Sequence, residues 1–503
     1  MNMAPSETVF PLPLEAFEQY MLADDKTHQP MVLVRQLFLS GYLQQTAFES
    51  AIEKAMERHP LLRALVRNSG RHEPYWVAAG ILEPRVDWAE IGRPLQTRMG
   101  EYLDLTSEVG LRVWVRQGLR SVIVTLQFHH ACIDGTGAIQ FITDLLAFYG
   151  RLTCRHEDPA PELLQLQQEL LRQRGRIPPQ LAGESGSRVG WTQKVSKLFR
   201  FITRKPSPLG PPHGSTDSTN TCPPFPGIVS HTFSKEETQS LKRVAKQQGA
   251  SLNDLLLRDL FLVINTWNSE HGREGIGRWL RIMMPVNLRT EEFSRLPAAN
   301  VLSYGFLTRD CRECDEPVQL LAGISRETRE IKFGGSSLMF LKSINMLRKI
   351  KGGLKRMSDP QKCYATVVLS NVGDITTRLA VSLPSRNGRL VAGDVVLEAV
   401  RGCPPLRQNT RAVFHVMTCC GEMTVAARGW PELFGVEETG DLLQRFIHQL
   451  HHSFRSVPDA VDWKTDCESV EQPSWEERIE APDRPGSETE DWFRQPVSGE
   501  RGR

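Results

Sequence analysis

Two adjacent histidines and a nearby aspartate form the part of the sequence best suited to chemistry. His129 and His130 close the apolar run Ser121–Phe128, which alternates as a buried strand does, and Asp134 and Gly135 follow after three residues. An imidazole titrates near neutral pH and can take a proton from an alcohol or an amine. Because a strand end is rigid and an Asp-Gly turn is tight, we expect this stretch to hold an imidazole against a bound substrate.

Asp134 and Cys132 are the other reactive side chains of this stretch. Asp134 lies across the turn from His130, and we expect it to orient the loop through an arginine rather than to act as the base. Cys132 has no neighbouring pattern typical of a cysteine nucleophile, so we expect it to point into the fold. The chain also lacks a Gly-x-Ser-x-Gly elbow. These patterns favour a reaction without an enzyme nucleophile.

Regular elements surround the two histidines. Thr46–Arg58 repeats apolar residues at the helical period, whereas Leu111–Arg116 and Val122–Phe128 alternate as strands do. Thr136–Gly150 returns to the helical period, and Gly150 is its expected end. The histidines are therefore predicted to lie between a buried strand and a long amphipathic helix.

A second region of mixed helices and strands follows in the other half of the chain. Lys235–Gln248 predicts a helix, and Ser251 is the expected N-cap of the next one, with Asp254 in its first turn. Apolar runs predict further strands at Leu280–Pro285, Ala365–Leu369, Val395–Glu398, Ala412–Met417 and Met423–Ala427. The two regions are of similar size and both mix helices with strands.

Shifts in composition divide the chain into four parts. We expect an N-terminal lobe at residues 1–174, a linker at 175–226, a C-terminal lobe at 227–457 and an acidic, disordered tail at 458–503. The linker is rich in Pro, Gly, Ser and Thr. Inside it, Trp191–Lys205 (residues 191–205) carries an apolar stripe with a basic rim. This pattern fits a helix docked on the protein's own surface or a peripheral contact with a membrane or a carrier protein.

The composition excludes several classes of protein. The 503 residues are 40% hydrophobic and 24% charged, and the formal net charge of +2 gives no reason to expect a nucleic-acid partner. No apolar run reaches the roughly 20 residues that span a bilayer, and from the first residues of the sequence we expect no secretory signal. Ten cysteines are too sparse for a disulfide scaffold, and the pair Cys311 and Cys314 lacks the second pair of a zinc site. We expect a cytoplasmic protein without a metal.

The stretch His129–Gly135 reads His-His-x-x-x-Asp-Gly, and in this it resembles a superfamily of acyltransferases. That superfamily contains condensation domains of nonribosomal peptide synthetases, polyketide-associated acyltransferases, alcohol acetyltransferases and the wax ester synthase group. Four further stretches are similar to family motifs and occur in the expected order: His59–Arg63, Gly249–Asp254, Met284–Arg289 with Asn300 downstream, and Ser370–Gly373. The resemblance covers about residues 10 to 457.

The resemblance implies a mixed α/β fold in which two lobes similar to chloramphenicol acetyltransferase form a V, with a tunnel between them. It implies that His130 is the general base, which deprotonates a hydroxyl or an amine that attacks an acyl thioester. His129 and Gly135 would support the motif. Asp134 would pair with an arginine, for which Arg289 is the candidate.

The resemblance also implies what such an enzyme binds. The donor would be acyl-CoA or the acyl-pantetheine of an acyl carrier protein, the acceptor would be an alcohol or an amine, and no cofactor would be bound permanently. Ser370 or Asn371 would lie in the tunnel near the developing oxyanion, where a hydrogen-bond donor stabilises the transition state. We find no adenylation domain in this sequence and therefore do not expect a multi-module synthetase.

Two alternatives remain open at this point. One is a stand-alone condensation enzyme that forms amides from carrier-bound substrates. The other is a non-catalytic scaffold of the same fold that binds a carrier or a lipid. Replacement of His130 separates these alternatives, because an enzyme should lose turnover while a scaffold should keep its binding.

Overall fold

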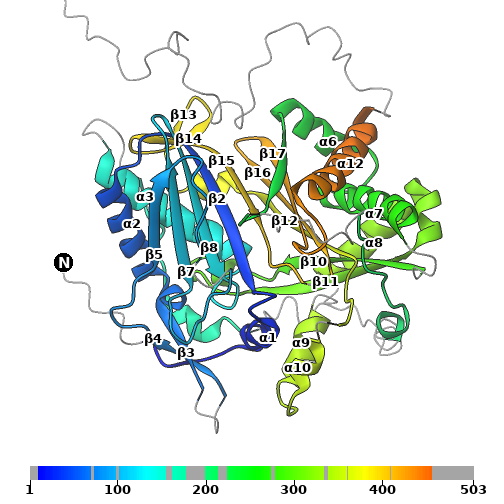
Figure 1. Ribbon diagram of the computed structural model, residues 1–503, viewed down its shortest axis with the longest axis horizontal. Coiled ribbons are helices and arrows are strands. Elements are labelled where there is room, and N and C mark those ends of the chain that lie inside the picture. Colours follow the sequence, from blue (N-terminus) through cyan, green and yellow to red (C-terminus); the bar gives the residue numbers. More distant parts are fainter. Residues whose placement is uncertain are drawn as a thin grey trace, which may run out of the picture.

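The computed structural model describes residues 9–68, 73–97, 101–154, 161–176, 199–212, 224–272, 278–333, 338–359, 361–407 and 409–455. These residues form two large β-sheets flanked by helices, together with a small three-stranded sheet (Figure 1). The mixed α/β fold class predicted from the sequence is confirmed.

The first large sheet has seven strands in the order β13-β14-β15-β2-β8-β7-β5. Along the chain these strands are β2 (Val32–Gly41), β5 (Arg85–Glu90), β7 (Leu111–Gln117), β8 (Ser121–His129), β13 (Ser385–Arg386), β14 (Arg389–Ala392) and β15 (Val395–Cys403). Helices α2 (Gln45–Arg58) and α3 (Gly135–Thr153) pack against each other beside this sheet. The predicted strand and helix on either side of the histidines are therefore present.

The first sheet is not built from the N-terminal part of the chain alone. Strand β15 pairs antiparallel with β2, from Val395 opposite Gly41 to Cys403 opposite Val34. Residues 385–403 therefore leave the predicted C-terminal lobe and complete the sheet of the first lobe. The pairing joins the two halves of the chain beside the strand that precedes the histidines.

The second large sheet has six strands in the order β11-β10-β12-β16-β17-β9. Its strands are β9 (Val229–Phe233), β10 (Trp279–Asn287), β11 (Leu302–Asp310), β12 (Val367–Asp374), β16 (Ala412–Cys419) and β17 (Glu422–Gly429). Four helices contact it or one another: α6 (Lys235–Gln247), α7 (Leu252–His271), α8 (Pro317–Phe333) and α12 (Val436–Arg455) (Figure 1). Strand β12 lies parallel to both of its neighbours, β10 and β16.

Shorter elements fill the space around the two large sheets. The small sheet joins β1 (Leu12–Pro13), β3 (Ala64–Arg67) and β4 (Tyr75–Ala78). Further α-helices are α1 (Ala16–Asp24), α9 (Leu338–Leu347), α10 (Gly353–Met357) and α11 (Thr376–Leu379). Short 3-10 helices occur at Pro60–Arg63, Gln168–Gln173, Glu291–Phe293 and Cys311–Asp315. Helix α1 contacts α9 and α10, which belong to the second half of the chain.

Helix α3 extends beyond the end that its glycine predicted. The helix runs through Gly150 to Thr153, so the prediction that Gly150 ends it was wrong. A Cβ at Gly150 would lie 2.8 Å from the Pro161 side chain and 3.2 Å from the Gly393 backbone nitrogen. The glycine is explained by this close approach of two other segments rather than by a helix cap.

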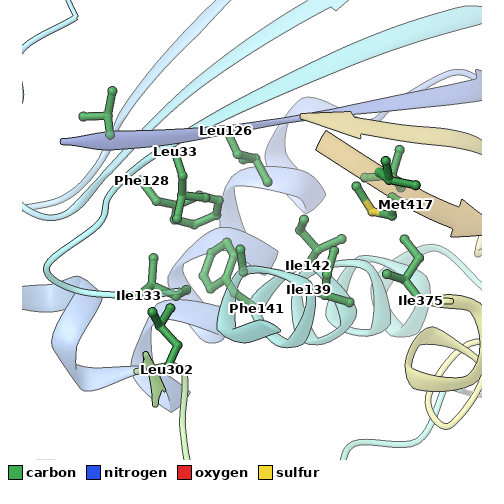
Figure 2. Packing of buried hydrophobic residues seen from close by; sticks show 14 of the residues in the cluster. Leu33, Leu126, Phe128, Ile133, Ile139, Phe141, Ile142, Leu302, Ile375 and Met417 are labelled. Atoms are coloured by element: carbon green, nitrogen blue, oxygen red, sulfur yellow. The ribbon is translucent and has the colours of Figure 1, made fainter. Parts of the chain in front are cut away.

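The core beside α3 fixes both ends of the loop that carries the histidine motif. Phe128 at the end of β8 meets Phe141 of α3 edge to face, with ring centroids 5.5 Å apart (Figure 2). Ile139 and Ile142 of α3 and Leu126 of β8 are fully buried in the same cluster. Residues 130–134 therefore connect a strand and a helix that are both anchored in the core.

The described part of the predicted linker packs onto the second lobe. Ser207 N donates to the carbonyl of Trp279 at 2.8 Å, and Leu209 is completely buried. Residues 191–198 of the basic segment and the predicted tail at 458–503 lie outside the described residues. Among the helices that are described, none has the length and apolar character needed to cross a membrane.

Candidate active site

A cavity of about 130 Å³ lies where the two large sheets meet. The first sheet and the loop after it contribute Leu33, Arg35, His130, Asp134 and Gly135, and the second sheet contributes Met283, Pro285, Asn287, Leu302, Tyr304, Val368, Ser370, Asn371 and Val372. The predicted base and both predicted oxyanion candidates therefore face one cavity. Arg289 is not among the residues that line it.

His130 has the tautomer that a general base requires. Its Nδ1 lies 2.9 Å from the carbonyl oxygen of Ile133. Since a carbonyl only accepts, Nδ1 carries the hydrogen and Nε2 keeps a free lone pair. Among the described residues, none forms a hydrogen bond with Nε2, and the ring lines the cavity with 6% of the residue exposed. Burial lowers the pKa of His130, although the Ile133 carbonyl and Asp134 oppose that effect, so the ring is neutral at pH 7.

The backbone of His130 is held from both halves of the chain. His130 N donates to the carbonyl of Met31 at 2.8 Å. From the second half, Asn300 Nδ2 donates to the carbonyls of His130 and Ala131, at 2.7 and 2.8 Å. The sequence placed Asn300 in a family motif without a role, and the structure shows that its amide holds the histidine loop.

His129 faces away from the cavity and is completely buried. Its Nδ1 accepts a hydrogen bond from Ala131 N at 3.0 Å, so Nε2 carries the hydrogen and donates to Asp25 at 3.2 Å. Asp25 also accepts from Met31 N at 2.8 Å. Both ring nitrogens of His129 are therefore engaged in holding the start of the loop.

Asp134 and Arg289 form an ion pair, for which the family resemblance had made Arg289 the candidate. Asp134 caps α3 by accepting from Gly137 N at 2.8 Å, and its other oxygen accepts from Arg289 Nη1 at 2.7 Å and from Val301 N at 2.9 Å. Burial alone would raise the pKa of Asp134, but Arg289 and these hydrogen bonds hold it below its usual range. Asp134 is therefore an ionised anchor and not a proton carrier.

Gly135 and Gly137 allow neighbouring groups to come close to the first turn of α3. A Cβ at Gly135 would lie 3.1 Å from Arg35 Nη2, and one at Gly137 would lie 2.9 Å from the Ile133 side chain and 3.2 Å from Ala299 N. Neither glycine has a positive φ. Their role is to leave space for a guanidinium and for the second half of the chain.

The two oxyanion candidates differ in what their side chains already bind. Asn371 Nδ2 donates to Asn253 Oδ1 at 3.2 Å, and Asn371 Oδ1 accepts from Gly373 N at 2.8 Å. Ser370 lines the same cavity, is 8% exposed, and its hydroxyl bonds to none of the described residues. Ser370 therefore has a donor to offer a ligand, whereas the Asn371 amide is committed to the fold.

Arg35 is a charged cavity residue that the sequence analysis missed. It lies on β2, 2% exposed, and donates through Nη1 to the carbonyl of Val34 at 2.9 Å. By the two-residue period of a strand it shares a face with Leu33 and Leu37, which are core residues. The signal that would have found it is the apolar run Val32–Leu39, in which Arg35 alternates with apolar residues.

His59 of the family-like stretch His59–Arg63 lies away from the cavity and links the lobes. Its Nε2 lies 3.1 Å from Asp144 of α3, and its Nδ1 accepts from Ala298 N at 2.9 Å. The histidine is completely buried. Its contacts join α2, α3 and the segment that leads to Asn300.

The cysteines that the sequence singled out are all free thiols. Cys132 is completely buried, and burial raises the pKa of its thiol. Cys311 and Cys314 are both free thiols. Within the described ranges, no cluster of three or more His, Cys, Asp or Glu side chains is arranged to hold a metal ion.

A larger cavity of about 660 Å³ adjoins the first one. The two share Tyr20, Met283, Tyr304 and Arg407 as lining residues. Aromatic side chains such as Phe306 and Phe340 line it, together with several arginines and glutamates. The cavity that contains His130 thus shares part of its wall with a space large enough for part of a second substrate.

The described end of the basic segment forms part of the larger cavity. Phe201 packs against Phe306, with ring centroids 5.2 Å apart, and the Arg281 guanidinium lies 4.2 Å from the centroid of the Phe201 ring. Phe199 and Ile202 are 66% and 61% exposed. One face of residues 199–205 therefore docks on the protein itself, as one of the two alternatives predicted.

Comparison with known proteins identifies the fold. No family model matches the sequence. Two uncharacterized proteins of Mycobacterium tuberculosis, from strains CDC 1551 and H37Rv, are each 22% identical to the chain over 386 residues, which cover 72% of this chain and 83% of each relative.

Three solved structures are similar over almost the whole chain. The first condensation domain of the CDA synthetase is 13% identical, covers 92% of this chain and 99% of its own, and has a TM-score of 0.59. Polyketide synthase associated protein 5 from Mycobacterium tuberculosis is 15% identical, covers 91% of this chain and 100% of its own, and has a TM-score of 0.56. The X-domain in its complex with OxyB from teicoplanin biosynthesis is 17% identical, covers 91% of this chain and 95% of its own, and has a TM-score of 0.55. The chain therefore has the fold of condensation domains and of polyketide synthase associated protein 5.

Proposed function

We propose that this protein is an acyltransferase that moves an acyl group from a thioester to a hydroxyl or an amine, with His130 as the general base. One observation carries the proposal. The Ile133 carbonyl fixes the hydrogen on Nδ1 of His130, and the unprotonated Nε2 belongs to a ring that lines a cavity between the two sheets. The fold shared with condensation domains supports the same class of reaction.

In the proposed reaction the acceptor O–H or N–H donates its proton to Nε2 of His130. The oxygen or nitrogen attacks the thioester carbon, and the carbon–sulfur bond breaks as the carbonyl re-forms. The proton then passes from Nε2 to the leaving thiolate, so the histidine returns to its starting state. Ser370 is the proposed donor to the oxyanion, because its hydroxyl faces the cavity and is not committed to the fold.

The two adjoining cavities support a reaction between two separately bound substrates. Proximity of two bound reactants can contribute about 7–11 kcal/mol to the lowering of the barrier, so no acyl-enzyme is required. Acyl-CoA and a carrier-bound acyl-pantetheine are both proposed donors, since each presents a thioester at the end of a narrow arm. The ester product of an alcohol acceptor is preferred here to an amide.

The test is release of thiol from a panel of acyl-CoA thioesters in the presence of alcohol and amine acceptors, with the products identified by mass spectrometry. H130A should lower turnover by about 10²–10⁴-fold, the usual contribution of a general base. His448 is exposed on α12, and H448A is the matched control that should leave turnover unchanged. Thiol release at the background rate with every acceptor would refute the proposal.

A non-catalytic role is the second candidate, because one of the similar structures is an X-domain in complex with another protein, OxyB. On this alternative the chain would bind a carrier or a partner protein and perform no transfer. H130A would then leave binding of acyl carrier protein intact, and wild-type protein would show no turnover to lose. An amide product from carrier-bound substrates would instead point to a stand-alone condensation enzyme.

A further inference from the structure

Arg35 is buried inside the candidate active site, and none of the described carboxylates forms an ion pair with it. Nη1 donates to the carbonyl of Val34 at 2.9 Å, and Nε has no hydrogen-bond partner among the described residues. The residue is 2% exposed and lines the same cavity as His130. Burying a guanidinium without an anion costs free energy. A bound ligand that supplies a negative charge would offset this cost.

The acidic residues of this cavity are already engaged by other arginines. Asp134 binds Arg289 at 2.7 Å, and Asp24 lies 3.2 Å from Arg407. Arg35 therefore remains a cation with no anion of its own in the described part of the cavity. Arg35 is attracted electrostatically by Asp134, but the described hydrogen bonds that the Asp134 carboxylate accepts come from Gly137, Arg289 and Val301.

Two glycines leave space for this guanidinium. A Cβ at Gly135 would lie 3.1 Å from Arg35 Nη2, and a Cβ at Gly402 would lie 2.5 Å from Arg35 Nη1. Arg378 at the exposed edge of the same cavity adds a second cation that forms no ion pair with the described acidic residues. The fold thus accommodates Arg35 in this position and places additional positive charge beside it.

We propose that Arg35 binds a carboxylate of the acceptor substrate, so that the acceptor is a free hydroxy acid or amino acid. This inference rests on the proposed acyl transfer and narrows its substrate class. A cavity of about 130 Å³ holds both Arg35 and His130, so an anion bound to Arg35 lies close to the reacting atoms. Arginine is well suited to a carboxylate because its planar fork can donate two parallel hydrogen bonds.

Other anions of acyl-transfer substrates fit this position less well. The phosphates of coenzyme A are separated from the thioester sulfur by the whole pantetheine arm, so they lie far from His130 during reaction. In an aminoacyl group on a carrier protein the carboxyl carbon is bonded to the thioester sulfur, so this group offers Arg35 no carboxylate. A free acid acceptor is the case in which a carboxylate and a nucleophile lie within a few bonds of each other.

The experiment compares matched acceptors in wild-type protein and in R35M. Lactate, glycolate and serine are each assayed beside their methyl esters, with thiol release as the readout. Wild-type protein should prefer the acids by about 10- to 100-fold in kcat/KM, the range that one charged hydrogen-bonded contact provides. In R35M the ratio of kcat/KM for each acid to kcat/KM for its methyl ester should fall to about one, whereas R35K should retain part of the preference.

Two controls separate binding from folding. R295M removes an exposed arginine that lines neither cavity and should leave the preference unchanged. Thermal unfolding of R35M should occur at or above the wild-type temperature, because replacing an unpaired buried charge by an apolar side chain is neutral or stabilising. A large loss of stability in R35M would show a structural arginine and would overturn the inference.

The remaining outcomes distinguish this inference from the proposed function. Equal activity on acids and esters would overturn the carboxylate site while leaving the acyltransferase intact. Equal losses on both substrates in R35M would assign Arg35 to the developing oxyanion and would also overturn it. If no acceptor reacts at all, calorimetric binding of the three acids to wild-type protein and to R35M decides the question. Binding that R35M abolishes supports the carboxylate site, and absence of binding refutes it.

Discussion

Arg289 donates through Nη1 to Asp134 over 2.7 Å and so joins the second half of the chain to the N-cap of α3. The same guanidinium donates through Nη2 to the carbonyl of Ala299 at 2.8 Å. The neighbouring Asn300 holds the carbonyls of His130 and Ala131. The loop that carries the proposed base is therefore positioned from across the interface between the lobes.

Removing Arg289 should destabilise the protein more than an exposed arginine would. Both partners are largely buried, with side-chain exposures of 11% for Arg289 and 2% for Asp134, so R289M leaves a carboxylate without its counter-charge. We expect the free energy of unfolding in urea to fall by about 3 kcal/mol. The free energy of unfolding of the double variant D134N/R289M should fall by less than the sum of the decreases in the single variants D134N and R289M. Losses that add would contradict coupling between these groups.

The pH dependence of turnover should have its lower limb below pH 6.5. Burial lowers the pKa of His130, and a general base acts only when it is neutral. Activity should therefore rise as pH increases through this lowered pKa and should be flat from pH 7 to 8. Profiles of kcat/KM against pH measure this directly. A limb centred above pH 7 would mean that another group is the base.

Ser370 and Asn371 should differ in their effects on catalysis. S370A removes a cavity hydroxyl that no described residue binds, and we expect kcat to fall by about 10²-fold with little change in thermal stability. N371A breaks contacts with Asn253 and Gly373, so it should lower stability more than it lowers kcat. The reverse pattern would assign the oxyanion donor to Asn371.

Cys132 should be inert even though it lies within the histidine motif. The residue is completely buried, and burial raises the pKa of its thiol, so little reactive thiolate forms at neutral pH. Iodoacetamide should leave Cys132 unmodified in folded protein, as read by peptide mass spectrometry. C132S should retain turnover within a few fold. Rapid alkylation of Cys132 that abolishes activity would reopen a covalent mechanism.

The elements nearest the histidine motif could be predicted because they are local patterns. The alternation of β8, the helical period of α3 and the capping role of Ser251 are each contained within a few turns or residues. The pairing of Asp134 with Arg289 was predictable only through the resemblance to other proteins, since 155 positions separate the two residues.

The features that were missed depend on which segments meet in space. The pairing of β15 with β2 could not be predicted from the periodicity of either strand. Hydrophobic alternation shows which face of a strand is buried but not which other strand pairs with it. Arg35 is polar in a strand, and such residues commonly face water. Here all of β2 except its last two residues is buried, so the arginine has no access to bulk solvent.

Asn300 should position the loop that carries the proposed base, His130. Its replacement therefore tests how that loop is held by the second half of the chain and leaves His130 itself unchanged. Its single amide group donates to the carbonyls of both His130 and Ala131, at 2.7 and 2.8 Å, and N300A removes both bonds. We expect kcat to fall at least tenfold with KM nearly unchanged, because a displaced imidazole impairs proton transfer more than substrate binding. The pH at the midpoint of the lower limb should stay where it is in wild-type protein. N300D should not rescue kcat, since a carboxylate cannot donate to a carbonyl. A rise in KM with kcat intact would instead place Asn300 in substrate binding.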